Sequence, residues 1–343
     1  MGRRTLEEHP PVRDLVVIGA SAGGVEALKR LVGDLPEDLP AAVCVVLHIA
    51  PTSTSALAGI LDRAGPLPCS PAVDDEPLRP GHIVVAPPDR HLLIEDGRAR
   101  LGVGPRENGH RPAVDALFRS AAEARWHGVV GVVLSGTRDD GSAGLAVIKS
   151  RGGAAVVQDP EDALYAGMPR SALAHVPVDA VAPIGLLAQS IVSLVRGEAL
   201  PGDVRASDPE LARGPEHQLI TVCPECGGVL TERDEAGMPG WRCHVGHLYS
   251  PRSLVEAQGA AVEAALWTAL RSLEDRGALL RRMTEQAETR GQRNSAAMFN
   301  LQSEQVGAQA DLLRGVLRER AAPAQRAFSE SETDEPMAAG EHA

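Results

Sequence analysis

Two kinds of hydrophobic spacing alternate along the first half of the chain. Short apolar runs rich in β-branched residues predict strands at residues 14–19, 41–47, 82–86, 128–135 and 154–158. Apolar residues three and four positions apart predict helices near residues 23–33, 54–64, 113–125, 142–151 and 184–196. The segment HLLIEDGRARLGV also predicts a hairpin, because Asp96-Gly97 suits a two-residue turn. Alternation of this kind over residues 12–197 predicts an α/β domain with a doubly wound, mostly parallel sheet.

The hydrophobic pattern changes after residue 197. Residues 198–217 lose apolar periodicity and are interpreted as a linker, and a compact cysteine-containing segment follows at residues 218–249. Residues 250–320 carry two apolar stripes, which predict a helical hairpin that packs on itself or on a partner. The stripes are Leu266, Leu270, Leu273, Leu280, Met283 and Ala287, then Met298, Leu301, Ala308 and Leu312. The tail, residues 321–343, contains SESETDEP and is predicted to be disordered.

Composition limits the class of protein. The 343 residues suffice for about two domains, and with 43% hydrophobic but 2% aromatic residues the core must be aliphatic. The net charge of -12 and the shortage of aromatic side chains argue against a nucleic-acid-binding surface. No run of about 18 apolar residues is present, so we expect no membrane insertion, and the N-terminus lacks the apolar core of a signal peptide. We therefore expect a cytoplasmic protein whose five cysteines are thiols or metal ligands rather than disulfides.

A glycine-rich turn, GASAGG at residues 19–24, follows the first predicted strand. It has Ser21 where a dinucleotide-binding fingerprint needs its second glycine, and it lacks the lysine of a Walker A loop. G-x-S-x-G between a strand and a helix is typical of a nucleophile turn, in which the serine hydroxyl projects above the end of the sheet. The N–H groups of the following helix can then face an oxyanion. Taken alone, the motif also fits a tight turn or an anion site.

Polar residues follow two other predicted strands. His48 ends the strand in VVLHIAP, and Asp139 and Asp140 follow the strand GVVGVVLS. Taken singly, His48 fits an ordinary polar residue, and the aspartates fit a helix cap. Because the carboxyl ends of parallel strands lie at one edge of a sheet, their coincidence with Ser21 favours a Ser–His–Asp site. The order Ser, His, Asp differs from the Ser, Asp, His of α/β-hydrolases, which argues against an ordinary lipase or esterase fold.

Residues 12–197 resemble the catalytic domain of the chemotaxis protein-glutamate methylesterases, the CheB type. The motifs that carry the resemblance are IGASAGG at 18–24, VVLHIAP at 45–51, APPDRHLL at 86–93, RPAVDALFRSAA at 111–122, LSGTRDDGSAGL at 134–145 and AGMPRSAL at 166–173. The resemblance implies that Ser21 is the nucleophile, His48 the general base and Asp140 the orienting acid. Asp140 matches the family aspartate because it directly precedes Gly141, which leaves Asp139 as a loop or cap residue.

The resemblance also implies a reaction and its partners. Ser21 is expected to cleave the γ-methyl ester of glutamate residues on a chemoreceptor-like protein without a catalytic cofactor, and the same chemistry extends to glutamine deamidation. Groups at Ala22, Gly136, Thr137 and Met168 are expected to support the oxyanion or the substrate. A methyltransferase and a histidine kinase are further candidate partners.

Two positions depart from family members that contain a regulatory receiver. Those proteins commonly carry threonine after the serine and methionine after the glycine of the aspartate loop, where this chain has Ala22 and Thr137. The S-G-T-x-D-D-G form resembles the receiver-less branch of the family. We therefore expect activity that does not depend on phosphorylation.

The cysteine segment has metal-ligand spacing. TVCPECGGVL gives Cys223-x2-Cys226, and WRCHVGHLYS gives Cys243-x3-His247. Four such ligands in a reducing compartment favour a structural zinc site in a zinc-ribbon-like module, with His244 as the competing fourth ligand. A redox dithiol or unpaired core cysteines are the alternatives.

This module resembles the short C-terminal extension of some stand-alone family members. A segment of its size cannot bury enough core to fold without metal, so we expect chelation to unfold it while the esterase domain keeps its activity. Cys44 and Cys69 lie in the predicted catalytic domain and are interpreted as ordinary buried residues.

Two other function classes fit parts of the sequence. A catalytically idle signalling scaffold would bind partners through the C-terminal half, and the intact Ser21, His48 and Asp140 argue against it. A nucleotide-binding domain would require nucleotide to protect the fold against heat.

Overall fold

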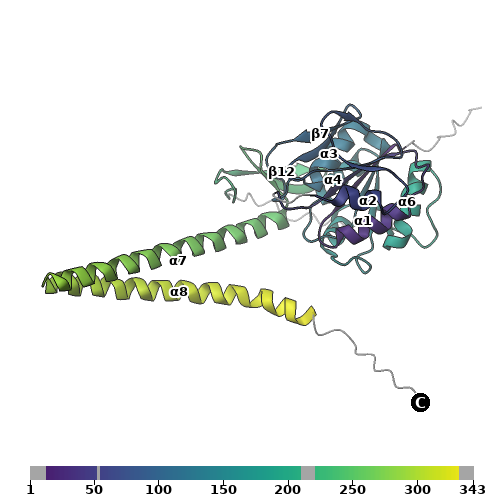
Figure 1. Ribbon diagram of the computed structural model, residues 1–343. Coiled ribbons are helices and arrows are strands. Elements are labelled where there is room, and N and C mark those ends of the chain that lie inside the picture. Colours follow the sequence, from purple (N-terminus) through teal and green to yellow (C-terminus); the bar gives the residue numbers. More distant parts are fainter. Residues whose placement is uncertain (1–12, 52–54, 210–220, 332–343) are drawn as a thin grey trace, which may run out of the picture. The chain divides into compact units, whose positions relative to one another are not determined.

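The computed structural model describes residues 13–51, 55–209 and 221–331 (Figure 1). These residues form two compact units that divide after Ala257. The first unit holds the predicted α/β domain together with the cysteine segment, and the second holds most of two long C-terminal helices. None of the helices in the described ranges is long and apolar enough to cross a membrane.

An eight-stranded sheet forms the centre of the first unit. Its strands are β1 (Leu15–Ala20), β2 (Ala42–Leu47), β3 (Cys69–Pro71), β5 (Ile83–Val85), β8 (Val129–Val133), β9 (Ala154–Gln158), β10 (Val178–Ala182) and β11 (Arg205–Ser207). They lie in the order β11-β10-β9-β8-β1-β2-β5-β3, and every pair is parallel except β10 with β11. The central strands are buried on both faces, so they read as unbroken apolar runs. The predicted doubly wound, mostly parallel sheet is confirmed.

Helices cover both faces of this sheet (Figure 1). One face carries α1 (Gly24–Gly33), α2 (Leu57–Asp62) and α6 (Ile184–Arg196), and the other carries α3 (Val114–Arg125), α4 (Ser142–Ser150) and α5 (Gly167–His175). Successive strand residues point to opposite faces, so Ile18 of β1 joins the first core and Val17 joins the second. Both cores consist almost entirely of aliphatic side chains, as the composition predicts.

A smaller antiparallel sheet contains the predicted hairpin. Its strands are β4 (Glu76–Pro77), β6 (His91–Glu95) and β7 (Arg98–Gly102), in the order β4-β7-β6. Asp96 and Gly97 have φ angles of 49° and 75°. Both values are positive, as a two-residue hairpin turn of this type requires. The predicted hairpin is confirmed.

Several elements of the domain, among them α5, β10 and β11, do not appear in the hydrophobic pattern. Helix α5 is short and contains Pro169, and strand β10 contains Asp179, whose carboxylate accepts hydrogen bonds from Lys149 Nζ at 2.8 Å. Strand β11 contradicts part of the predicted linker, because it pairs antiparallel with β10. Backbone pairing at a sheet edge needs no apolar side chains, so the sequence gives no sign of it. Residues 210–217 of the predicted linker lie outside the described residues.

The cysteine segment folds as a three-stranded antiparallel sheet of β12 (Leu230–Glu235), β13 (Met238–Cys243) and β14 (Leu248–Tyr249). It belongs to the same compact unit as the α/β domain. Met238 enters the core that contains α3 and α4. Arg119 of α3 pairs with Glu235 at 2.8 Å and also with Glu107. Cysteine spacing marks the module in the sequence but does not indicate these contacts.

The second unit contains the predicted helical hairpin. Helix α7 (Pro251–Thr289) and helix α8 (Arg293–Ser331) are joined by a turn in which Gly291 has a φ angle of 72°. The stripe predicted on α7 is confirmed, since Leu270, Leu280 and Ala287 are buried.

The stripe predicted on α8 is wrong. Met298, Leu301 and Leu312 are 49%, 57% and 70% exposed. The buried positions are instead Ala296, Ser303, Val306, Ala310 and Leu317. Four of these recur with the seven-residue spacing of a coiled coil. Three of the four are small, so the larger apolar residues on the exposed face obscure the stripe in the sequence.

Helix α8 also continues past residue 320, where the sequence predicts the hairpin to end and a disordered tail to begin. The extension to Ser331 passes through Pro323, which disfavours a helix interior, and residues 321–327 (AAPAQRA) contain four alanines, the strongest helix former. Residues 332–343 of the predicted tail lie outside the described residues.

Gly144 determines how closely α3 and α4 approach each other. A Cβ atom at this position would lie 2.6 Å from Phe118 Cβ and 3.0 Å from the carbonyl oxygen of Asp115. We predict that Gly144→Ala lowers the free energy of unfolding, measured in urea, by about 1–3 kcal/mol, the usual cost of overpacking. Gly59→Ala in α2 is the matched control, because its Cβ would meet only the flexible end of Arg63, at 3.4 Å. The control should be neutral or stabilising, and equal losses in the two variants would contradict the prediction.

Candidate active site

The predicted catalytic residues lie in three loops that follow neighbouring strands. Ser21 follows β1, His48 follows β2, and Asp140 lies in the loop after β8. The sheet order β8-β1-β2 places β1 between the other two strands. Strand β1 is also where the strand order reverses, and the carboxyl edge at such a switch point is where open α/β sheets bind ligands.

The structure brings Ser21, His48 and Asp140 into one hydrogen-bonded row. His48 Nε2 donates to Asp140 Oδ2 at 2.7 Å, and His48 Nδ1 lies 3.1 Å from Ser21 Oγ. Because the carboxylate accepts, Nε2 carries the ring proton, and Nδ1 is left to accept the proton of the Ser21 hydroxyl. The side chains of His48 and Asp140 are 6% and 1% exposed, whereas Ser21 is partly exposed. In chymotrypsin, Nε2 of the histidine faces the serine and Nδ1 faces the aspartate. Here the two nitrogens are exchanged, but each can serve the same role.

Backbone contacts and a glycine hold the turn that carries Ser21. The N–H of Ser21 donates to the Ser135 carbonyl at 3.0 Å, and the Ser135 hydroxyl donates to the Ala22 carbonyl at 2.8 Å. Gly23 has a φ angle of 71°, and a Cβ atom there would lie 2.8 Å from Ser135 Oγ. Helix α1 begins immediately after Gly23. The turn therefore has the strand–turn–helix setting that a nucleophile turn requires.

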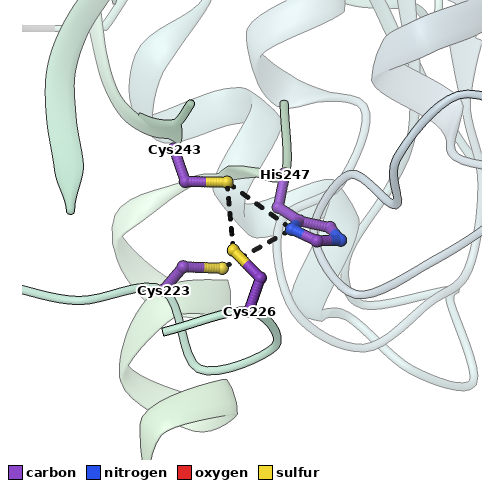
Figure 2. Close-up of side chains that lie close together, drawn as sticks. All are labelled: Cys223, Cys226, Cys243 and His247. Atoms are coloured by element: carbon purple, nitrogen blue, oxygen red, sulfur yellow. Dashed lines mark hydrogen bonds between the residues drawn. The ribbon is translucent and has the colours of Figure 1, made fainter. Parts of the chain in front are cut away.

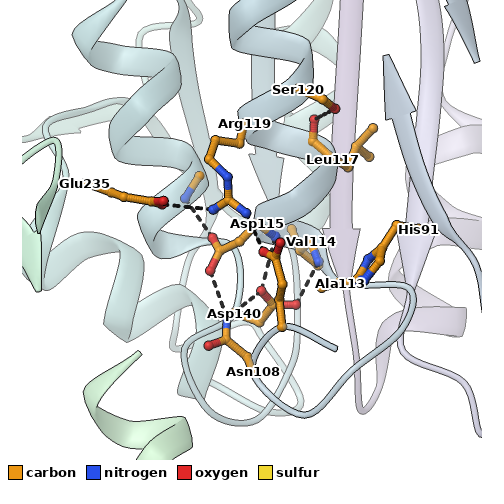
Figure 3. Close-up of polar contacts among 12 residues, drawn as sticks. His91, Asn108, Ala113, Val114, Asp115, Leu117, Arg119, Ser120, Asp140 and Glu235 are labelled. Carbon is orange, nitrogen blue, oxygen red and sulfur yellow. Dashed lines mark hydrogen bonds and ion pairs between the residues drawn. The ribbon is translucent and has the colours of Figure 1, made fainter. Parts of the chain in front are cut away.

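Four donors hold the carboxylate of Asp140, and Figure 3 shows three of them, from Asn108, Val114 and Asp115. Besides His48, the N–H of Val114 donates to Oδ2 at 2.7 Å, and the N–H of Asp115 donates to Oδ1 at 3.1 Å. Asn108 Nδ2 donates to Oδ1 at 2.9 Å. Burial alone would raise the pKa of Asp140, but the hydrogen bond and charge of His48 and the other donors hold this pKa well below its usual range. Asp140 therefore stays a carboxylate that can orient His48.

Asp115 and Asn108, which the sequence does not single out, hold Asp140 and its loop in position. Asp115 accepts the N–H groups of Gly141 and Gly144 at 3.0 and 2.7 Å, which ties the aspartate loop and α4 to the start of α3. Asn108 Nδ2 donates to Asp115 Oδ2 at 2.8 Å as well as to Asp140 (Figure 3). Burial and the charge of Asp140 raise the pKa of Asp115. An amide donor between two buried carboxyl groups offsets their repulsion.

The four groups predicted to support the oxyanion or substrate differ in their surroundings. Within the described residues, the N–H groups of Ala22 and Thr137 have no hydrogen-bond partner, so both are candidate oxyanion donors. The N–H of Gly136, by contrast, donates to the Tyr165 carbonyl at 2.9 Å. Gly136 instead permits close packing, because a Cβ atom there would lie 2.1 Å from Met168 Sδ. Met168 is fully buried and packs against Gly136.

His110 stacks on His48, a contact that the sequence does not indicate. The two ring centroids are 3.7 Å apart and the ring planes differ by 8°. Burial and the neighbouring His48 lower the pKa of His110 to about 4. His110 is therefore neutral near pH 7 and covers one face of His48 without adding charge there.

Asp139 is buried beside the triad and has a different partner. Its Oδ1 accepts a hydrogen bond from Ser253 Oγ at 2.8 Å, and its carbonyl accepts the N–H of Ser142 at 3.2 Å at the start of α4. Asp140, and not Asp139, contacts His48. The interpretation of Asp139 as a loop or cap residue agrees with these contacts.

The four predicted metal ligands also lie together (Figure 2). Cys226 Sγ is 3.6 Å from Cys243 Sγ, and His247 Nδ1 is 3.6 Å from Cys223 Sγ and 3.5 Å from Cys243 Sγ. In a tetrahedral zinc site, bond lengths of about 2.3 Å to sulfur and about 2.0–2.1 Å to nitrogen give edges of about 3.8 Å (S···S) and about 3.6 Å (S···N). Three of the six donor separations match these edges, and all four ligand atoms lie within 4.8 Å of one another, so the cluster fits the chemistry of a zinc site.

A carboxylate orients His247 from the far side of its ring. His247 Nε2 lies 3.3 Å from Glu225 Oε2, and the Tyr249 hydroxyl donates to Glu225 Oε1 at 3.0 Å. Histidines that bind a metal through one nitrogen usually donate from the other nitrogen to such a group. His244, the competing ligand in the sequence, is exposed and is not in the cluster.

The other two cysteines lie in the catalytic domain. Cys44 is fully buried in β2, as expected, and burial raises the pKa of its thiol to about 12. Cys69 is only partly buried, which corrects the expectation, because it belongs to the edge strand β3. Burial raises the pKa of the Cys69 thiol to about 12 as well. Both thiols therefore stay protonated.

Comparison with known protein families assigns this domain. The model of the CheB methylesterase family matches residues 16–191, which are more than half of the 343 residues. The chain belongs to the CheB methylesterase family. The crystal structure of the Thermotoga maritima CheB methylesterase catalytic domain is similar, with 33% sequence identity and a TM-score of 0.51. The match covers 54% of this chain and 100% of that domain.

Curated relatives of this CheB-family chain carry two activities in their names. Protein-glutamate methylesterase/protein-glutamine glutaminase 2 of Anaeromyxobacter dehalogenans is 39% identical over 199 residues, which are 57% of this chain and 58% of the relative. A putative protein-glutamate methylesterase/protein-glutamine glutaminase of Leptospira interrogans is 38% identical over 182 residues, which are 53% of this chain and 94% of that relative. The chain thus spans less than two thirds of the first relative and nearly all of the second.

The lowered pKa of His110 predicts a pH-dependent loss of stability. In the unfolded chain a histidine takes up a proton near pH 6.5, whereas the folded protein keeps His110 neutral down to about pH 4. As the pH falls through this window, the unfolded chain binds more protons, so the free energy of unfolding should fall by about 1–3 kcal/mol. His110→Phe keeps a flat ring and should remove this dependence, as measured by urea denaturation at about pH 7 and about pH 4.5.

His127→Phe, at an exposed position, is the matched control and should keep the pH dependence of the wild type. An unchanged pH dependence in His110→Phe would show that His110 does not titrate in this window.

Proposed function

We propose that this protein is a protein-glutamate methylesterase that hydrolyses γ-methyl esters of glutamate residues on a chemoreceptor-like protein. The observation that carries the proposal is the hydrogen-bonded row of Ser21, His48 and Asp140 at the carboxyl edge of the sheet. The names of the relatives support the choice of substrate and add glutamine deamidation as a second reaction. We expect no catalytic cofactor, because the row supplies a nucleophile, a base and an orienting acid.

In the proposed reaction, Ser21 Oγ attacks the ester carbonyl carbon while its proton moves to His48 Nδ1. The N–H groups of Ala22 and Thr137 face the developing oxyanion, and Asp140 stabilises the imidazolium. The ester C–O bond then breaks, His48 returns its proton to the leaving oxygen, and methanol departs from a glutamyl ester of Ser21. Water, deprotonated by His48, attacks this ester and releases glutamate, and the proton returns to Ser21. With glutamine as the substrate, ammonia leaves in place of methanol.

A partner-binding role of the C-terminal hairpin is the second candidate. The exposed Met298, Leu301 and Leu312 of α8 favour it. A catalytically idle scaffold and an active esterase differ in one measurement, the release of methanol from a methylated receptor. A methyltransferase or histidine kinase as partner and a cytoplasmic location stay predictions.

Ser21→Ala should lower the rate of methanol release by about 10⁴-fold or more, because it removes the nucleophile. His48→Ala should cost about as much, and the double variant should be little worse than either, because the two residues act as a unit. Ser272→Ala, at an exposed position of α7, is the matched control and should keep the wild-type rate. A double variant far slower than both single variants would contradict a shared mechanism.

Asp140→Asn should also be severe, because the carboxylate that orients His48 and stabilises its protonated form is lost. The loss should appear as a lower kcat with the protein still folded. Asp34→Asn, after α1 and exposed, makes the same chemical change away from the site and should have no effect. Full activity of Asp140→Asn would mean that the aspartate was wrongly assigned.

We also propose that Cys223, Cys226, Cys243 and His247 hold one structural zinc ion. The distances among these four donors support the assignment. Bound zinc would cross-link the two ends of the module and supply much of its folding free energy. The residues Glu225 and Tyr249 would fix the ring of His247.

We predict one zinc per chain in the purified protein, measured by elemental analysis. Cys243→Ser and His247→Ala should lose the metal, because a closed tetrahedral site needs all four ligands. Cys69→Ser and His244→Ala are the matched controls and should keep it. Loss of zinc in His244→Ala but not in His247→Ala would mean that the fourth ligand was wrongly assigned.

A further inference from the structure

The cysteine module contacts the catalytic loops at Asn108. The N–H of Ser250 donates to Asn108 Oδ1 at 2.8 Å, and the N–H of Asn108 donates to the Leu248 carbonyl at 2.8 Å. The other end of the same amide, Nδ2, donates to Asp140 at 2.9 Å. We propose that Asn108 is a positioning residue for Asp140 and that the metal-bound module holds Asn108 in place, so that esterase turnover depends on the metal. This inference rests on the esterase and zinc functions proposed above.

The amide of Asn108 has one orientation that satisfies its neighbours. Its oxygen faces the N–H of Ser250. Its nitrogen faces the carboxyl groups of Asp140 and Asp115 (Figure 3). A flipped amide would place its oxygen against carboxyl oxygens and leave the Ser250 N–H without an acceptor. Asn108 is 2% exposed, so water has little access to replace these bonds. Loss of the Ser250 contact therefore frees the amide to turn away from Asp140.

A second set of contacts joins the same two regions. Ser253 Oγ at the start of α7 donates to Asp139 Oδ1 at 2.8 Å, and both residues are buried. Arg138 Nε lies 2.5 Å from Glu256 Oε2. Arg138 and Asp139 directly precede Asp140 in the loop after β8. Residues 248–256 therefore hold the aspartate loop itself as well as Asn108.

The contact leaves almost no free space. The cavity between Asn108, Asp115 and strands β12 to β14 has a volume of about 20 Å³. A water molecule needs about 10–15 Å³ by the same measure, so there is room for one at most. A displacement of β14 is thus transmitted to Asn108 rather than absorbed by a gap.

The proposed metal ligands adjoin these contacts in the chain. His247 directly precedes Leu248, and Ser250 follows shortly after. The core of the module consists of Cys223, Leu230, Cys243, Tyr249 and Leu254, and two of these five are themselves proposed ligands. A core this small does not hold a fold without a cross-link. Loss of the metal should therefore release residues 247–250 from Asn108.

This geometry revises the expectation that chelation leaves the esterase unaffected. Stripping the zinc should lower kcat by about 10- to 100-fold, the usual effect of losing a residue that orients an active group from behind. KM should change little, because the altered contact is to Asp140 and not to substrate.

The test uses the full chain in four forms, wild type and Asn108→Ala, each with zinc and after stripping by a chelator. Wild type should lose kcat on stripping and regain it when zinc is added back. Asn108→Ala should have a lowered kcat with zinc and little further loss on stripping, because the link is already cut. The contacts of Asn108 with Leu248 and Ser250 also stabilise the metal-bound module, so Asn108→Ala should bind zinc more weakly than wild type, measured by competition with a chromogenic chelator.

Asn300→Ala, at an exposed position of α8, is the matched control and should equal wild type in both kcat and zinc affinity. Asn108→Asp keeps the shape of the side chain but adds a third carboxylate, so it should be at least as slow as Asn108→Ala. If Asn108→Ala does not fold, Ser253→Ala takes its place, since it removes only the hydroxyl bond to Asp139 and should weaken both kcat and zinc binding.

Wild type that keeps its kcat after stripping would overturn the proposal. An Asn108→Ala variant that loses as much on stripping as wild type would do so too. Purified protein without zinc would contradict the proposed metal site instead, and the kcat of Asn108→Ala would still test the positioning of Asp140. Zinc-loaded wild type without esterase activity would contradict the proposed enzyme, and the zinc affinity of Asn108→Ala would still test the link.

Discussion

A buried carboxylate organises the catalytic part of this protein. Asp140 can carry a charge inside an aliphatic domain because hydrogen-bond donors meet both of its oxygens. Two of these donors are N–H groups at the start of α3, where a helix has unpaired N–H groups and the positive end of its dipole. The third is the amide of Asn108 and the fourth is His48. Three segments that are distant in the sequence, around His48, residues 108–115 and Asp140, must therefore meet before His48 can be oriented.

The sequence predicts the positions of Ser21, His48 and Asp140 because each follows an apolar run, and parallel strands end at one edge of a sheet. It does not predict that β8, β1 and β2 are neighbours, since strand order depends on pairing between distant segments. The sequence does not indicate Asn108 and His110, because they lie in an irregular loop, where no periodicity marks a side chain that contacts the site. Their importance comes from what surrounds them, and one sequence does not contain that information.

In the C-terminal half, too, the sequence predicts some features and does not predict others. Close pairs of ligands identify the cysteine cluster from spacing alone, because one ion needs four donors within a few ångströms. Spacing does not indicate that Met238 enters the catalytic core or that Arg119 pairs with Glu235. On α8 the large apolar residues are misleading, because the buried seam uses small residues at Ala296, Ser303 and Ala310. Hydrophobic pattern thus predicts that a helix exists more reliably than which face it buries.

Two residues beside the triad have left-handed backbone conformations, and residues 248–256 contact both of them. Asn108 and Arg138 have φ angles of 52° and 67°, in the left-handed region, which asparagine tolerates and arginine seldom adopts. At a residue such as arginine this conformation costs about 1–3 kcal/mol and persists only where neighbouring contacts hold it. Asn108 is held by Leu248 and Ser250, and Arg138 pairs with Glu256. All three of these holding residues lie beyond residues 16–191, the stretch that matches the family. In this chain the loops around Asp140 therefore depend on residues outside the catalytic domain as the family defines it.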